Sequence, residues 1–204
     1  MPSKLVFPGG VVQEIDHSGD WHAVYEKVTG RHLTDINFKL SPAASRSSHG
    51  TLPPDVAYRI CAIRETFEES GLLLATNGDL LLSSQEPFIV SCSADELMKA
   101  AADQRQKVEQ KPEYFLQMCR DLGVVPNIWA LNDWRNWLTP VFRKVSKPPA
   151  KPKRFNTMFY VCCIDCDSVP RTSADETETT QAQVSYVLAP CLFSCTVAVY
   201  SNVI

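Results

Sequence analysis

The 204-residue chain contains 45% apolar, 21% charged and 9% aromatic residues, which fits one globular domain and excludes a disordered chain. Twenty Lys and Arg against 23 Asp and Glu give a formal net charge of −3. A mildly acidic chain is a poor candidate for general binding to nucleic acid or to acidic membranes. Its eight cysteines are scattered through apolar stretches, which favours a reducing compartment over a secreted disulfide framework.

The start of the chain predicts a strand followed by a long insertion. The apolar run Leu5-Val6-Phe7 stops at Pro8-Gly9-Gly10, which is a turn signal at the end of a strand. Residues from about 11 to 53 are polar and weakly periodic. We therefore expect an insertion there, with one helix near Trp21–Val28.

The remainder of the chain predicts a mixture of helices and strands. Capping residues and helix-ending glycines place three helices at about Asp55–Ser70, Ser93–Val108 and Pro112–Leu122. Alternating apolar runs place strands at Leu72–Ala75, Leu80–Leu82, Trp137–Phe142 and Phe155–Ile164. This mixture indicates a small α/β or α+β layered domain.

The predicted helix at about Asp55–Ser70 carries three grouped carboxylates. Because a helix turns about 100° per residue, its apolar residues form one stripe, made of Val56, Ile60, Ile63 and Phe67. Glu65, Glu68 and Glu69 share the opposite face at i, i+3 and i+4. Like charges at this spacing repel, whereas a divalent cation such as Mg²⁺ or Mn²⁺ would reverse that effect. The alternative is a solvated acidic helix face.

Residues 64–72, Arg-Glu-Thr-Phe-Glu-Glu-Ser-Gly-Leu, resemble the signature of the Nudix hydrolase superfamily. That signature runs Gly, five residues, Glu, seven residues and then Arg-Glu-U-x-Glu-Glu-x-Gly-U, where U is a bulky aliphatic residue. Gly10 matches the opening glycine, and Thr66 departs from U. Gly10 and Arg64 enclose 53 residues instead of the signature's thirteen. Counted back from Arg64, the intermediate Glu falls at Val56 and is missing.

The long insertion and three further segments, Asp55–Ala62, Asn127–Leu131 and Trp137–Pro140, make the chain similar to one Nudix branch. This is the animal coenzyme A (CoA) diphosphatase branch, nucleoside diphosphate-linked moiety X motif 19, and the resemblance covers about residues 1–183. It implies a Nudix-like α/β/α sandwich with a mixed sheet, in which the first and last elements are incomplete. It also implies a metal-dependent enzyme that hydrolyses the diphosphate of CoA and acyl-CoAs. The products would be adenosine 3′,5′-bisphosphate and (acyl-)4′-phosphopantetheine.

The resemblance assigns roles to six residues around the predicted helix. Glu65 and Glu69 would be the main Mg²⁺ or Mn²⁺ ligands, and Glu68 a third ligand or a water contact. Arg64 precedes the cluster, can reach Glu68 at i+4, and would hold the glutamates in place. Gly9 and Gly10 would shape the loop beside the metal. We expect a small-molecule substrate, and neither a nucleic-acid partner nor stable membrane association.

Two groups of residues are candidates for binding the adenine-nucleotide end of CoA, and each group has a plainer interpretation. Lys153 and Arg154, in the loop Lys147–Arg154, could contact the extra phosphate of CoA, or they could be part of a solvated hairpin tip. A group of tryptophans could stack a base, but aromatic residues at this density are more often core; the group is Trp129, Trp134 and Trp137.

Two other functions remain open at this stage. Thr66 and the missing intermediate Glu allow a catalytically impaired relative that binds CoA or a nucleotide without turnover, or an inactive fragment. A metal site that neutralises phosphate charge also allows hydrolysis of another nucleoside diphosphate derivative. The resemblance favours a peroxisomal or mitochondrial location. No targeting signal is visible in the chain, so the cytosol is the alternative.

The last segment, residues 184–204, is expected to be an aberrant or disordered apolar tail after a domain of residues 1–183. The 26 residues from Thr179 to Ile204 carry no charge, a length that would suit a membrane anchor, but Pro190 and many polar residues oppose it. We favour translated intron sequence as the origin of the tail. Gln183-Val184-Ser185 can be encoded as CAG-GTA-AGT, which is the consensus of an exon end followed by an intron donor.

Overall fold

The computed structural model describes residues 7–33, 52–77, 89–90, 95–138, 155–165 and 194–203. The α-helices are α1 (Asp20–Thr29), α2 (Pro54–Ser70), α4 (Asp95–Gln110) and α5 (Glu113–Leu122). Two short 3-10 helices are η1 (Glu14–His17) and η4 (Ile128–Ala130). The strands are β1 (Gly9–Val11), β2 (Ala75–Thr76), β3 (Ile89–Val90), β4 (Val125–Pro126), β5 (Asn132–Leu138), β6 (Asn156–Asp165) and β7 (Ser194–Val203).

Five of these strands form one mixed sheet in the order β1-β7-β6-β3, with β5 also paired to β6. β1 runs parallel to β7, whereas β7 and β5 run antiparallel to β6. Gly9 pairs with Tyr200 and Gly10 with Ser201. Among the strands that the structure describes, β1 is therefore joined to the rest of the sheet through β7. The two remaining strands, β2 and β4, form a separate antiparallel pair.

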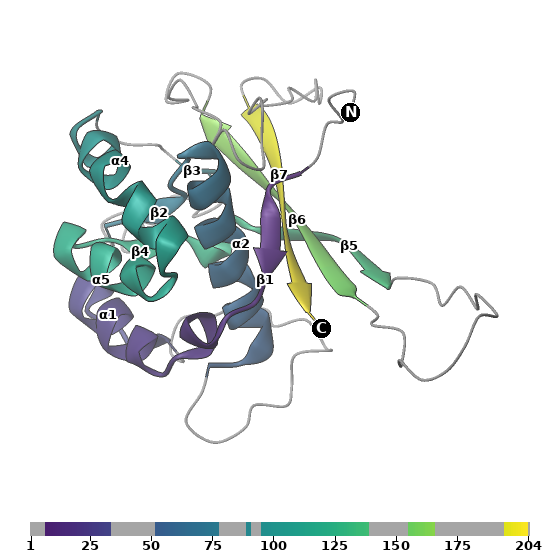
Figure 1. Cartoon of the computed structure of the whole chain (residues 1–204), viewed down its shortest axis with the longest axis horizontal. Helices are drawn as coiled ribbons and strands as arrows, with labels where there is room; N and C mark the ends of the chain where they lie inside the picture. The colour runs from purple at the N-terminus through teal and green to yellow at the C-terminus, as the bar shows by residue number, and fades with distance from the viewer. Residues whose placement is uncertain are drawn as a thin grey trace.

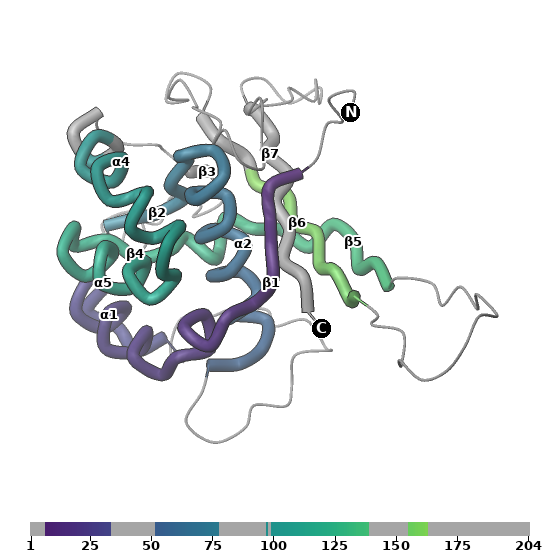
Figure 2. The backbone as a smooth tube through the Cα atoms, in the orientation of Figure 1, coloured from purple at the N-terminus to yellow at the C-terminus, as the bar shows by residue number. Residues whose placement is uncertain are grey.

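Helix α2 lies between the sheet and the other helices (Figures 1 and 2). Thirteen of its 17 residues are buried, because one side faces the sheet and the other faces α1, α4 and α5. The predicted apolar stripe faces the helices, and the rings of Phe67 and Phe115 lie 6.2 Å apart. A helix buried on two sides must pair its polar residues, so the charged residues of α2 are held in specific contacts.

The bounds of α2 follow from its local sequence. Pro54 occupies the first turn of α2. The N–H groups of a first turn have no partner within the helix, so the N–H group that proline lacks costs no hydrogen bond. Gly71 ends the helix with a φ of 76°, a left-handed conformation that glycine adopts without steric cost, and its N–H donates to the Phe67 carbonyl at 2.9 Å. These are the two signals from which the helix was predicted, and the prediction is confirmed.

The other fold predictions agree with the structure in part. The α+β class is confirmed, as are the helices now seen as α1, α4 and α5, and the described helices lie on one face of the sheet (Figure 1). The turn predicted at Pro8-Gly9-Gly10 is wrong, because both glycines belong to β1. The strand expected from Trp137 begins earlier, at Asn132 in β5. The strand predicted at Leu80–Leu82 lies outside the described residues.

The C-terminal segment contributes a strand to the middle of the sheet. Residues 194–203 form β7, which pairs with β1 and β6, and the aberrant or disordered character expected of the tail stays a prediction. The rest of the 184–204 segment lies outside the described part of the chain, and its proposed origin in an intron stays a prediction. None of the helices in the described ranges has the length and apolar character needed to cross a membrane.

The edge of the sheet at β5 exposes aromatic side chains. All seven residues of β5 are exposed, including Trp134 at 52% and Trp137 at 61%, so the core assignment of these two tryptophans is wrong. Trp129, which lies in η4, is buried as expected. Trp134 meets Phe7 and Phe159 edge to face, each with ring centroids 6.2 Å apart, and the rings of Phe7 and Phe159 lie 6.1 Å apart. These three residues form an aromatic cluster on the sheet.

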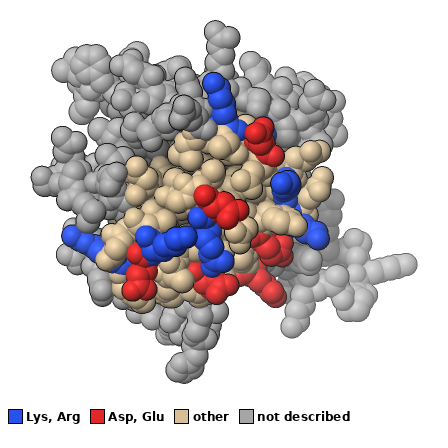
Figure 3. Space-filling view, turned by 90° about the vertical axis from the view of Figure 1, so that its left-hand side faces the viewer, with Lys and Arg blue, Asp and Glu red and all other residues tan. Residues whose placement is uncertain are grey.

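The helical face of the molecule carries charges of both signs. In Figure 3 the Lys and Arg side chains on this face are interspersed with Asp and Glu. Among the described residues of this face the opposite charges lie close together, so these residues do not produce the large positive field that attracts a nucleic-acid backbone.

Candidate active site on helix α2

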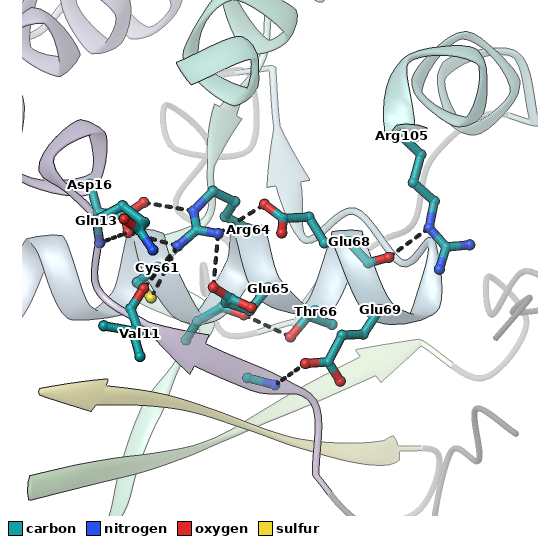
Figure 4. Close-up of polar contacts among 12 residues, drawn as sticks. Val11, Gln13, Asp16, Cys61, Arg64, Glu65, Thr66, Glu68, Glu69 and Arg105 are labelled. Atoms are coloured by element: carbon teal, nitrogen blue, oxygen red, sulfur yellow. Dashed lines mark hydrogen bonds and ion pairs between the residues drawn. The ribbon is translucent and has the colours of Figure 1, made fainter. Parts of the chain in front are cut away.

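Arg64 is the centre of an ion-pair network on the face of α2 that lies toward β1 (Figure 4). Its Nε and Nη2 atoms donate to Oδ1 and Oδ2 of Asp16, both at 2.9 Å. Its Nη1 atom donates to Oε1 of Glu65 and of Glu68, both at 2.8 Å. Arg64 is only 1% exposed, so these contacts are shielded from water. One guanidinium contacts three carboxylates, so this network carries a net charge of −2 when all three are ionised.

Asp16 is a site residue that the sequence analysis missed. It lies in η1 and is completely buried, and its Oδ2 also accepts the backbone N–H of Gln13 at 2.9 Å. Five residues, 11–15, separate Gly10 from position 16. Position 16 is therefore the place of the intermediate Glu in the Nudix signature. The carboxylate reported as missing at Val56 is therefore supplied by Asp16, and the insertion follows it. Forward counting from the glycine would have found it.

Gly9 and Gly10 let strand β1 approach the glutamates closely. A Cβ atom on Gly10 would overlap the carboxylate of Glu65, so any residue other than glycine would force that side chain to move. Gly9 has a φ of 153°, and its N–H donates to Oε1 of Glu69 at 3.0 Å. The double glycine thus provides space and a hydrogen-bond donor within a strand.

The three glutamates are largely shielded from water, which strengthens the repulsion among their carboxylates. Glu65, Glu68 and Glu69 are 14%, 12% and 7% exposed. Loss of water around Glu68 raises its pKa to about 7, although the neighbouring Arg64 acts in the opposite direction. Neutralisation of further negative charge at this cluster would be favourable, since it would lower the repulsion among the carboxylates.

The cluster fits a divalent cation in its donor chemistry and in its surplus of negative charge. Carboxylate oxygens are the ligands that Mg²⁺ and Mn²⁺ prefer. Among the described residues, no three His, Cys, Asp or Glu side chains already converge as ligands. Instead, Arg64 holds Glu65 and Glu68, and Gly9 holds Glu69. The three side chains would have to turn toward a common point to bind a metal ion together.

The structure brings together six of the eight predicted site residues: Gly9, Gly10, Arg64, Glu65, Glu68 and Glu69. The predicted ion pair between Arg64 and Glu68 is present. The catalytic and metal-binding roles of these residues stay predictions. Lys153 and Arg154 lie outside the described residues, so their predicted phosphate contact is not located.

A second buried arginine ties α2 to the sheet. Arg59, 4% exposed, contacts Asp55 in its own helix and Asp133 in β5, and its guanidinium carbon lies 4.7 Å from the ring centroid of Tyr160 in β6. Arg59 also donates to the Leu131 carbonyl. This network was not predicted from the sequence. It fixes the N-terminal half of α2, and the Arg64 network fixes the C-terminal half.

Comparison with known proteins identifies a family. The family model described as the NUDT19 Nudix domain matches residues 1–190. The chain is 38% identical over 192 residues to acyl-coenzyme A diphosphatase NUDT19 of Xenopus laevis, an alignment that covers 88% of this chain and 47% of the relative. It is 40% identical over 189 residues to the Gallus gallus protein of that name, covering 87% of this chain and 48% of the relative.

The Homo sapiens protein of the same name is 37% identical over 179 residues, which cover 80% of this chain and 44% of the relative. This chain thus spans about half the length of the curated relatives it matches. No solved structure was found to match it. Nudix hydrolases generally use divalent metal ions. With a family model matched over residues 1–190 and the signature residues assembled around Arg64, the chain belongs to the NUDT19 Nudix domain family.

Proposed function

We propose that this chain hydrolyses the diphosphate bond of CoA and acyl-CoAs. The products would be adenosine 3′,5′-bisphosphate and 4′-phosphopantetheine or its acyl derivative. The observation that carries the proposal is the group of three glutamates beside β1, in which Arg64 holds Glu65 and Glu68 and the Gly9 amide holds Glu69. The relatives named acyl-coenzyme A diphosphatase support the choice of substrate.

We further propose Mg²⁺ or Mn²⁺ as the cofactor, with Glu65 and Glu69 as the main ligands and Glu68 as a third. When bound, the ion would neutralise phosphate charge and lower the pKa of a bound water. The chain's own residues provide the remaining functions. Arg64 orients two of the carboxylates, and one of the three carboxylates accepts the proton of the attacking water. The glycines let β1 approach the carboxylates of Glu65 and Glu69 closely.

Two observations favour turnover over the alternative of a binding-only relative. Asp16 occupies the signature position that the sequence analysis reported as vacant, and it holds Arg64 with two hydrogen bonds. Thr66, at the position where the signature has a bulky aliphatic residue, is buried and donates its hydroxyl hydrogen to the Ala62 carbonyl at 2.7 Å. Neither departure from the signature therefore disturbs the glutamates.

The decisive experiment is CoA hydrolysis with Mn²⁺ by the full 204-residue chain and its Glu69→Gln variant. The substitution keeps the shape of the side chain and removes its charge, so we expect a rate at least 100-fold lower, which is a usual loss for a catalytic group. Glu26→Gln is the matched control, because Glu26 is exposed on α1. Equal rates for the wild-type chain and Glu69→Gln would refute the proposal.

The same assay separates the other candidate functions. CoA binding measured by calorimetry without any hydrolysis would favour the binding-only relative. Faster hydrolysis of another nucleoside diphosphate derivative than of CoA would favour a different substrate. We also propose a peroxisomal or mitochondrial location, based on the family resemblance alone. Imaging of the tagged chain in cells together with markers of both organelles tests this location.

A further inference from the structure

The last turn of α2, which carries Glu68 and Glu69, is held by donors from outside the helix backbone. The last four carbonyls of a helix have no partner within the helix and need other donors. Gly71 donates to the Phe67 carbonyl at 2.9 Å. The next carbonyl, that of Glu68, accepts a hydrogen bond from Nε of Arg105 at 2.8 Å. A residue of α4 therefore completes the end of the helix that bears the glutamates.

Arg105 reaches this carbonyl because of how α4 packs. Ala101 and Val108 of α4 are completely buried in the core, and Arg105 follows Ala101 by one turn, so it shares the inward side of α4. Figure 4 shows its side chain extending from α4 toward the C-terminal turn of α2. A positive charge at a helix C-terminus is favourable, and a charged donor makes the stronger type of hydrogen bond.

Glu68 is consequently held at both its side chain and its main chain. Arg64 binds its carboxylate at 2.8 Å, and Arg105 binds its carbonyl at 2.8 Å. Glu69 follows directly and contacts Gly9 at 3.0 Å. A shift in the last turn of α2 would therefore move the carboxylates of both residues relative to β1.

We propose that Arg105 is a positioning residue for Glu68 and Glu69, a role that lies outside the Nudix signature. The inference rests on the proposed diphosphate hydrolysis. Arg105 acts through the backbone of α2 and so controls where the two carboxylates lie when a metal ion and a diphosphate are present. Placement matters because a displacement of about 1 Å can lower a rate on the order of 100-fold.

The test compares Arg105→Gln with Lys107→Gln in the full-length chain. Lys107 is an exposed residue of the same helix, so its replacement removes an equal charge without changing α2. Three quantities are measured: Mn²⁺ affinity by titration calorimetry, kcat and KM for CoA, and amide hydrogen exchange at Gly71 and Leu72. We expect Arg105→Gln to lower kcat and Mn²⁺ affinity by about 10- to 100-fold with little change in KM. Exchange should accelerate at the two amides.

A purely structural role would produce a different result. If Arg105→Gln lowers the melting temperature but leaves kcat, Mn²⁺ affinity and the two exchange rates of the folded protein unchanged, the proposal is overturned. Arg105→Lys retains a charged donor and should recover part of the loss; no recovery would also count against positioning. If the wild-type chain hydrolyses no diphosphate, the proposed function fails. In that case Mn²⁺ affinity and amide exchange still decide whether Arg105 positions the glutamates.

Discussion

Asp16→Asn is the most informative substitution outside the glutamate cluster. The change keeps the size of the side chain and removes its charge. The new amide would present a donor to the Arg64 guanidinium, so one of the two hydrogen bonds between these residues is lost. Arg64 would keep Glu65 and Glu68 as partners. Arg64 would then have no charged partner on the η1 side of the buried site.

The expected loss of stability can be worked out from the burial of the pair. Asp16 is 0% and Arg64 1% exposed, so solvent screening does not weaken the interaction. Removal of one partner from a buried ion pair costs about 3–5 kcal/mol, and the two remaining carboxylates place the cost near the lower limit, at about 3 kcal/mol. For a chain of this size, about 3 kcal/mol corresponds to a fall in Tm of roughly 6–12 °C.

The assay is thermal unfolding followed by circular dichroism at neutral pH, supported by urea titration. Glu14→Gln is the matched control: Glu14 lies in the same 3-10 helix but is exposed, and its replacement should change stability by less than about 0.5 kcal/mol. A loss below about 1 kcal/mol for Asp16→Asn would contradict the role of Asp16 as the buried partner of Arg64. CoA hydrolysis should fall as well, because Arg64 orients the glutamates.

Three further predictions concern the same site. Gly10→Ala places a methyl group on the Glu65 carboxylate, so calorimetry should show a loss of about 1–3 kcal/mol; an unchanged Tm would contradict the close approach. In metal-free protein the raised pKa of Glu68 adds stability that is present below pH 4.5 and is lost as the pH rises through about 7. Glu68→Gln in EDTA should remove that part of the pH dependence, and identical slopes would refute the assignment. Deletion of residues 191–204 removes β7, which pairs with β1, so the amides of β1 should exchange faster; equal exchange would show that β1 is held otherwise.

Helix α2 could be predicted from the sequence because all its signals are local. The apolar stripe, the opening Pro54 and the closing Gly71 each depend on neighbouring residues, and α2 matches them. The grouping of the three glutamates and the reach of Arg64 to Glu68 follow from helix geometry alone. The family resemblance was carried by the same short segment and is confirmed by the family match.

The parts that were missed depend on contacts between distant residues. Asp16 lies 48 positions before Arg64, so its contact with Arg64 becomes visible only when η1 is placed against α2, although forward counting from Gly10 would have placed it in the signature. Arg105 and Arg59 bind carbonyls and carboxylates of other elements, which no spacing rule indicates. Trp134 was expected in the core because aromatic residues usually are, but its strand lies at the outer part of the sheet and exposes it.

Strand β7 belongs to the sheet of this domain but lies outside the residues that the family model matches. The family match ends at residue 190, whereas β7 begins at Ser194 and lies between β1 and β6. The glycine that contacts Glu69 therefore pairs with a strand that lies outside the residues matched by the family model. Two homologous chains with identical signature residues could differ in activity because of this one neighbour, and an alignment restricted to the signature would not reveal the difference.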